Sequence, residues 1–112
     1  MSEPSWIATM NVVFVQPDGA RLPGSIRISR PEPAFERDRQ CSYGIEPLAK
    51  TQAIFGADDL QALLLAVRMC GVELALFQRR GGRIEYPPDA DGHPGESWDP
   101  SATFAEFFRV PT

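Results

Sequence analysis

Two adjacent aspartates, Asp58 and Asp59, with Gln61 close behind them, form the polar cluster in the sequence that most resembles a functional site. Adjacent carboxylates can share a proton or hold a cation, and Gln61 can hydrogen-bond the backbone of a neighbouring strand. The same residues also suit the start of a helix, where carboxylates accept hydrogen bonds from the unpaired N–H groups of the first turn. We therefore expect helix capping from this cluster rather than catalysis.

The remaining candidates for chemistry lack partners in the sequence. The segment Asp89-Ala90-Asp91-Gly92, with Glu96 after it, lacks the third ligand and the correctly spaced glutamate of a calcium loop, so it predicts a turn. His93 is the sole histidine and has no nucleophile near it. Cys41 falls on the apolar face of a predicted strand, where a thiol is inert. We expect no metal, no cofactor and no catalytic residue, and the sequence argues against an enzyme.

Composition and charge limit the classes of partner. The net charge is −4, with 15 acidic against 11 basic residues. A nucleic-acid-binding protein usually carries a basic stripe, and the nearest feature is Arg79, Arg80 and Arg83. These arginines lie where a long helix is predicted to end, and cations stabilise that end of the helix dipole. We therefore expect no nucleic-acid partner.

The apolar and cysteine patterns indicate a cytoplasmic protein. No basic segment precedes the first apolar stretch, which argues against a signal peptide, and no run approaches the ~18 apolar residues of a membrane span. Cys41 and Cys70 have no CxxC spacing, so we expect two reduced, buried thiols and no membrane association.

Alternating apolar residues predict an antiparallel sheet. In residues 6–16, Ala8, Met10, Val12 and Phe14 share one face, and the valines between them make the other face partly apolar, as in a central strand. A Pro-Asp-Gly turn at residues 17–20 leads to a second strand, with a bulge or late start at Pro23-Gly24. This second strand spans residues 21–30, and further strands are predicted at 40–46, 50–55 (a weak pattern) and 83–86.

A long helix is predicted from Asp58 to Arg79. One apolar stripe at helical spacing is expected to face the sheet, and it consists of Leu60, Leu63, Leu64, Val67, Gly71 and Leu74. The alternative is a helix that ends at Cys70, followed by a strand over residues 72–77. Residues 31–39 and 87–101 read as loops, the second of them mobile.

A second apolar stripe, Leu65, Met69, Val72 and Leu76, lies nearly opposite the first on this helix. A helix packed on a single sheet should be polar there, so something must cover the stripe. The first candidate is the C-terminal segment, where Phe104, Phe107 and Phe108 suit a short helix folded back on the body. The second is a homodimer or another protein that binds the exposed patch.

Two short motifs carry a family resemblance. Residues 41–45 read C-x-Y-x-I, and residues 56–63 read GADDLQAL. Together they resemble a family of short, uncharacterised bacterial proteins classed as a domain of unknown function, over about residues 6 to 86. The resemblance implies a β-meander followed by a helix, and a bacterial origin, but no activity.

The sequence thus predicts a single α+β domain over residues 1–112. It has an antiparallel β-meander of three to five strands, one long helix packed on one face, and a C-terminal aromatic segment. The first functional hypothesis is a non-catalytic protein-binding or assembly module that uses the second stripe. The alternative is a small-molecule binder or minor enzyme, with a pocket between sheet and helix near Gln61, Tyr43 and Trp6.

Overall fold

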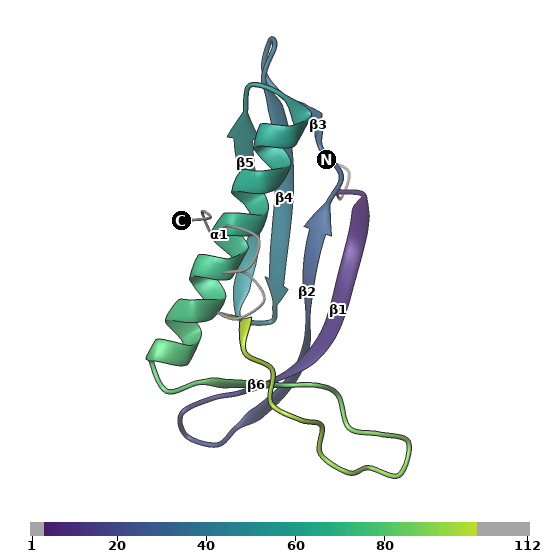
Figure 1. Cartoon of the computed structure of the whole chain (residues 1–112), viewed down its shortest axis with the longest axis vertical. Coiled ribbons are helices and arrows are strands. Elements are labelled where there is room, and N and C mark those ends of the chain that lie inside the picture. The colour runs from purple at the N-terminus through teal and green to yellow at the C-terminus, as the bar shows by residue number, and fades with distance from the viewer. Residues whose placement is uncertain (1–3, 101–112) are drawn as a thin grey trace, which may run out of the picture.

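The computed structural model describes residues 4–100, which form one antiparallel sheet with a long helix across one face (Figure 1). The elements in chain order are β1 (Trp6–Val15), β2 (Arg21–Ser29), β3 (Glu32–Pro33), β4 (Arg39–Glu46), β5 (Ala49–Gly56), α1 (Asp59–Arg79) and β6 (Arg83–Glu85). The α+β class is as predicted, and the sheet of six strands exceeds the predicted range. The additional strand is the two-residue β3, inside a segment predicted to be a loop.

β4 is the central strand of the sheet. β5 pairs along one of its edges, so β2 and β3 share the other edge, and β1 and β6 continue the sheet beyond β2. β6 pairs with β1 only at Val13, Phe14 and Val15, so the first part of β1 is an edge strand. The prediction of a central strand was correct only for that end of β1. Within residues 4–100 the outer edge of β5 has no partner strand.

The β1–β2 hairpin turns where the sequence predicts. Gly19 has φ 89°, a left-handed conformation that glycine adopts without strain, and Asp18 Oδ1 accepts a hydrogen bond from Ala20 N at 2.9 Å. The bulge or late strand start expected at Pro23-Gly24 was wrong, because β2 already begins at Arg21 and its pairing with β1 is regular there and shifts instead between Trp6 and Ala8. Gly24 is needed for close packing, since a Cβ on it would lie 2.1 Å from the Glu46 carbonyl oxygen.

The helix begins and ends as predicted. Asp58 is its N-cap, and its Oδ1 accepts a hydrogen bond from Gln61 N at 2.7 Å, which confirms capping at this cluster. Gly81, at φ 96°, follows its last turn. Residues 72–77 are helical throughout, so the alternative of a helix ending at Cys70 is wrong.

The helix face that packs on the sheet matches the predicted stripe only in part: Gly71 and Leu74 are buried and Leu63 packs against the core, as expected. Its buried residues are mostly small: Ala62, Ala66, Cys70, Gly71 and Leu74. Leu60 and Leu64 are 65% and 47% exposed, so placing them in the core was wrong. Small side chains let α1 approach closely, and a Cβ on Gly56 would already lie 2.6 Å from Ala62 N. The close fit of small side chains therefore decides which side of the helix packs on the sheet, whereas hydrophobicity alone predicts the side with the leucines.

The core lies between α1 and the sheet. Phe14, Tyr43, Leu74 and Ile84 are among its fully buried side chains. Phe77 meets Phe14 edge to face, with ring centroids 5.7 Å apart, and so joins the end of α1 to β1.

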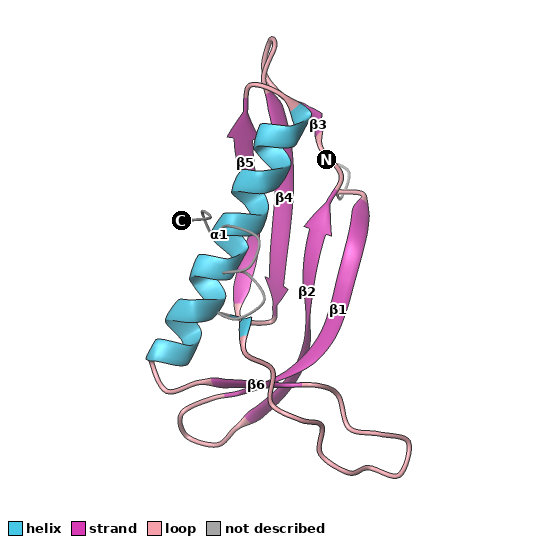
Figure 2. Cartoon of the chain, in the orientation of Figure 1, coloured by secondary structure: helices cyan, strands magenta, loops and turns pink. Residues whose placement is uncertain are grey.

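The chain after β6 returns along it. Tyr86 N donates to Glu96 O at 2.9 Å and Trp98 N to Ile84 O at 2.8 Å, so both ends of the long loop in Figure 2 are tied to the body. Trp98 packs against the core and Pro100 is fully buried. Mobility of this loop stays a prediction, and the predicted fold-back of Phe104, Phe107 and Phe108 lies outside the described residues.

Candidate functional site

The most conspicuous surface of the described chain is one side of α1. We call Leu65, Met69, Val72 and Leu76 the helix flank. Met69, Val72 and Leu76 are 40%, 42% and 41% exposed, and Leu65 is half-buried. These are the residues of the second predicted stripe, and within residues 4–100 no segment covers them fully. They lie beside the sheet-facing residues, where the sequence interpretation put them nearly opposite its first stripe.

The helix flank lies on the β5 side of the helix. α1 packs over β4 and β5 and runs antiparallel to β5 (Figure 1). With Ala66 and Cys70 against the sheet, the right-handed turn of the helix puts Met69 and Leu76 beside β5, and Leu64 and Val67 on the β2 side. In agreement, Leu76 and Ala49 of β5 line the same groove. The flank therefore adjoins the free edge of the sheet.

That groove, about 680 Å³ in volume, opens between the last turns of α1 and two turns of the sheet. Its walls are mainly apolar, with Leu48, Leu76 and Phe77 among them, and Glu73 and Arg80 bring opposite charges to it. A pocket between sheet and helix was predicted, but this groove is at the opposite end of the helix from Gln61.

The three residues predicted to line a pocket lie apart from one another. Gln61 Oε1 accepts a hydrogen bond from Ala57 N at 2.6 Å, so it closes the turn before the helix rather than reaching a strand. Trp6 lies on the sheet face away from the helix, since a Cβ on Gly44 would be 3.4 Å from its ring and Arg27 stacks 5.8 Å from the ring centroid. Tyr43, the neighbour of Gly44, faces the helix.

Tyr43 connects the sheet to the helix. Its hydroxyl donates to Glu73 Oε1 at 2.6 Å, and its side chain is buried. Burial raises the pKa of Tyr43 above its ordinary value, and the hydrogen bond to Glu73 and the negative charge of Glu73 act in the same direction. A phenol that keeps its proton is a structural donor, so this pair fixes α1 on β4.

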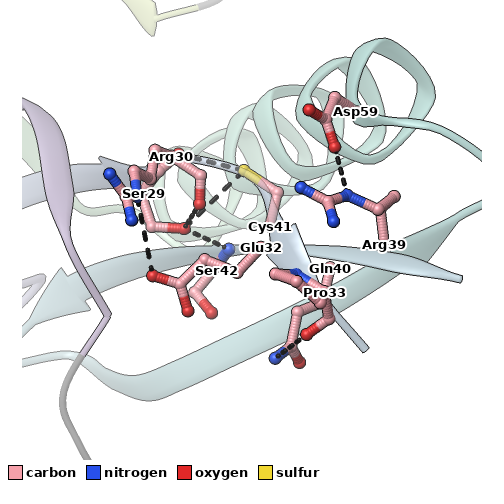
Figure 3. A network of polar contacts seen from close by, with 9 residues as sticks. All are labelled: Ser29, Arg30, Glu32, Pro33, Arg39, Gln40, Cys41, Ser42 and Asp59. Carbon is pink, nitrogen blue, oxygen red and sulfur yellow. Dashed lines mark hydrogen bonds and ion pairs between the residues drawn. The ribbon is translucent and has the colours of Figure 1, made fainter. Parts of the chain in front are cut away.

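The two cysteines are free thiols with no exposed surface. Cys41 Sγ donates to Ser29 O at 3.1 Å, and Ser29 Oγ accepts from Ser42 N at 2.7 Å, so the group joins β2 to β4 (Figure 3). Burial raises the pKa of Cys41, opposed in part by its hydrogen bond with Ser29, and burial raises the pKa of Cys70 to about 12. Neither thiol suits nucleophilic chemistry.

Asp89, Asp91 and His93 form an exposed group whose possible ligand atoms lie within 4.8 Å of one another. Asp89 Oδ1 accepts from the backbone N–H groups of Asp91 and His93, each at 2.9 Å. The backbone hydrogen bond from His93 is the main cause that lowers the pKa of Asp89. The segment is thus a turn stabilised by the Asp89 carboxylate, and a turn is what the sequence predicts. The sequence did not indicate that His93 belongs to the same group.

Glu85 is a buried charge that sequence reasoning missed. Its two carboxylate oxygens accept from Arg21 Nη2 at 2.5 Å and Arg83 Nε at 3.1 Å. The hydrogen bond from Arg21 lowers the pKa of Glu85 more than burial raises it, and Arg83 adds to the lowering. Arg83 therefore belongs to an ion pair in β6 and not to the end of the helix dipole, where its sequence position had suggested it.

The fold and these sites define a small α+β protein whose described chain carries an apolar helix flank, a groove at one end of α1 and two inert thiols. A family model for a domain of unknown function (DUF6968) matches residues 13–94, well over half of the chain, and the chain belongs to this family. The match extends beyond Tyr86, where the sequence resemblance ended. No curated protein and no solved structure matches the chain.

Proposed function

We propose that this chain is a non-catalytic protein-binding or assembly module whose binding surface is the helix flank. The observation that carries the proposal is the composition of α1: the residues buried against the sheet are mostly small, and large apolar residues remain exposed beside them. Large contiguous apolar patches on a soluble domain mark interaction surfaces more often than isolated apolar residues do.

The charge pattern of the helix supports a protein partner. Between Leu60 and Phe77 its charged residues are Arg68 and Glu73, and Glu73 is engaged by Tyr43. By length and composition alone α1 could also cross a membrane, a test that core helices pass as well. α1 packs on β4 and β5, so we take it as a helix of the folded domain, and the proposal includes a cytoplasmic location without membrane contact.

Affinity capture with the tagged chain tests the proposal. The double substitution Met69→Glu and Val72→Glu should abolish recovery of a stoichiometric protein partner, while Leu64→Glu should keep it. Leu64 is the matched control, because it is equally apolar and exposed but lies on the β2 side of α1. Recovery that is unchanged by the double substitution would contradict the proposal.

The groove supports a second candidate function, the binding of a small molecule. Its apolar walls, with the acidic side chains of Asp18 and Glu73 and the basic side chain of Arg80, resemble a ligand site in composition. Calorimetric titration with amphiphilic zwitterionic compounds checks this candidate, with Arg80→Ala and Glu73→Gln as variants that should weaken binding. Binding that neither substitution changes would place the ligand elsewhere.

A further inference from the structure

We propose that the partner of the helix flank is a second copy of this chain, paired through the free edge of β5 so that the two sheets join and the two α1 helices pack side by side. This inference rests on the protein-binding function proposed above and names its partner.

The first argument is the unpaired edge. β5 pairs with β4 on one side, from Ala49 to Gly56, and within residues 4–100 its other side has no strand partner. Alternate residues of a strand direct their N–H and C=O groups to each edge, so this edge presents unmet hydrogen-bonding groups. β5 contains no proline and a single charged residue, Lys50, so little in its sequence blocks pairing.

The second argument is the position of α1 at the edge of the sheet. α1 packs over β4 and β5 and crosses them obliquely, so its first turns lie over β4 and its last turns lie towards the outer side of β5 (Figure 1). If β5 pairs with the β5 of a second copy, the two α1 helices therefore lie next to each other on one face of the joined sheet. Strand pairing thus brings the helix flanks of the two copies close together.

The third argument is the pattern of the helix flank. Leu65, Met69, Val72 and Leu76 are separated by four, three and four residues, the repeat of a helix that packs against another helix. In an antiparallel pair centred between Met69 and Val72, Leu65 of one copy faces Leu76 of the other. The flank has no charge, so the two copies meet through apolar side chains.

The fourth argument is the symmetry. A two-fold axis perpendicular to the sheet keeps both helices on the same face of the joined sheet. The axis passes beside one residue of β5, and that residue then pairs with the same residue of the other copy. At Gln52 or Ala53 this arrangement sets Lys50 opposite Ile54 or Gly56 of the other copy. No like charges oppose each other, and the interface is self-complementary, as a two-fold dimer requires.

Light scattering on the full 112-residue chain tests the proposal. We expect twice the monomer mass of 12.4 kDa for the unchanged protein. Val72→Glu should raise the dimer dissociation constant by about a hundredfold or more, because two charges enter the apolar interface. Ala53→Lys should do the same through the strand edge, and Leu64→Glu should leave the dimer intact. Circular dichroism establishes that each variant keeps its fold.

Three outcomes overturn the proposal. A monomer that still captures another protein through the flank leaves the protein-binding function standing and removes the second copy as its partner. A dimer disrupted by Leu64→Glu but not by Val72→Glu has its interface on the β2 side. A monomer that dimerises only after residues 101–112 are deleted has its flank covered by its own C-terminal segment.

Discussion

Buried polar side chains in this protein have defined partners. In the part of the chain that the structure describes, each buried side-chain nitrogen or oxygen has a hydrogen-bond partner. Glu85 shows why this matters: an unpaired carboxylate at its position would carry a desolvation cost, and two arginines from different strands remove it. Its carboxylate therefore joins β2 to β6.

Glu85→Gln should lower the free energy of unfolding by about 1 kcal/mol at neutral pH, because its arginine partners are largely exposed and solvent screens them. The pKa of Glu85 is lowered in the folded state, so its stabilisation is present above the ordinary value of 4.5. It is lost as the pH falls from there through the lowered pKa. Urea unfolding at neutral and acidic pH should show the difference shrinking with acid. Glu96→Gln, at an exposed position, is the control, and a difference independent of pH would contradict the assignment.

Cys41 and Cys70 should be unreactive towards Ellman's reagent in the native protein at mildly alkaline pH. Both are completely buried, and burial raises the pKa of each, so very little accessible thiolate exists. Two thiols should react at the rate of unfolding once urea is added. Arg37→Cys, at an exposed position, should add a thiol that reacts at once. Rapid labelling of the unchanged native protein would show that one of the two sites opens without unfolding.

At the scale of elements, the sequence predicted the positions of strands and helix well and the packing of the helix poorly. Alternation and turn residues located β1, β2, β4 and the ends of α1, because those signals are local. Which side of α1 meets the sheet depends on how closely the backbone can approach it, and that distance is set by Gly56 and the alanines across the interface. A hydrophobicity pattern contains no information on this distance.

A pair of opposite substitutions tests which face of α1 is buried. Ala66→Leu should destabilise the protein by about 1–3 kcal/mol, because the added atoms have no room against the sheet. Leu64→Ala should change the free energy of unfolding by about 0.5 kcal/mol or less, since Leu64 is 47% exposed. Denaturant unfolding of both variants gives the comparison. The reverse order of effects would restore the leucine stripe as the core face.

At the scale of the whole molecule, the candidate site combines features that are distant in the sequence. The spacing of its residues alone identified the helix flank as a stripe outside the sheet-packed face of α1, and its role in binding stays a prediction. The groove could not be identified in this way, because it needs the β1–β2 turn, the β4–β5 turn and the end of α1 together. The free edge of β5 likewise follows from the strand order, and short local patterns do not determine that order because β2, β3 and β5 all pair with β4.

Hydrogen exchange gives a test of the assembly that does not depend on mass. Amides of α1 are bonded within the helix, and those of β1 facing β2 are bonded within the sheet, whether or not a second copy is present. About half of the amides of β5 face its outer edge and can be protected only by a strand from outside residues 4–100. We therefore expect peptides covering residues 49–56 to exchange faster in Val72→Glu than in the unchanged protein. Peptides from β1 should be the same in both, and Leu64→Glu should match the unchanged protein throughout. Equal exchange of β5 in all three proteins would contradict the dimer. The outer edge of β5 would then be exposed in each protein or covered by residues of its own chain, and the two sheets could not join.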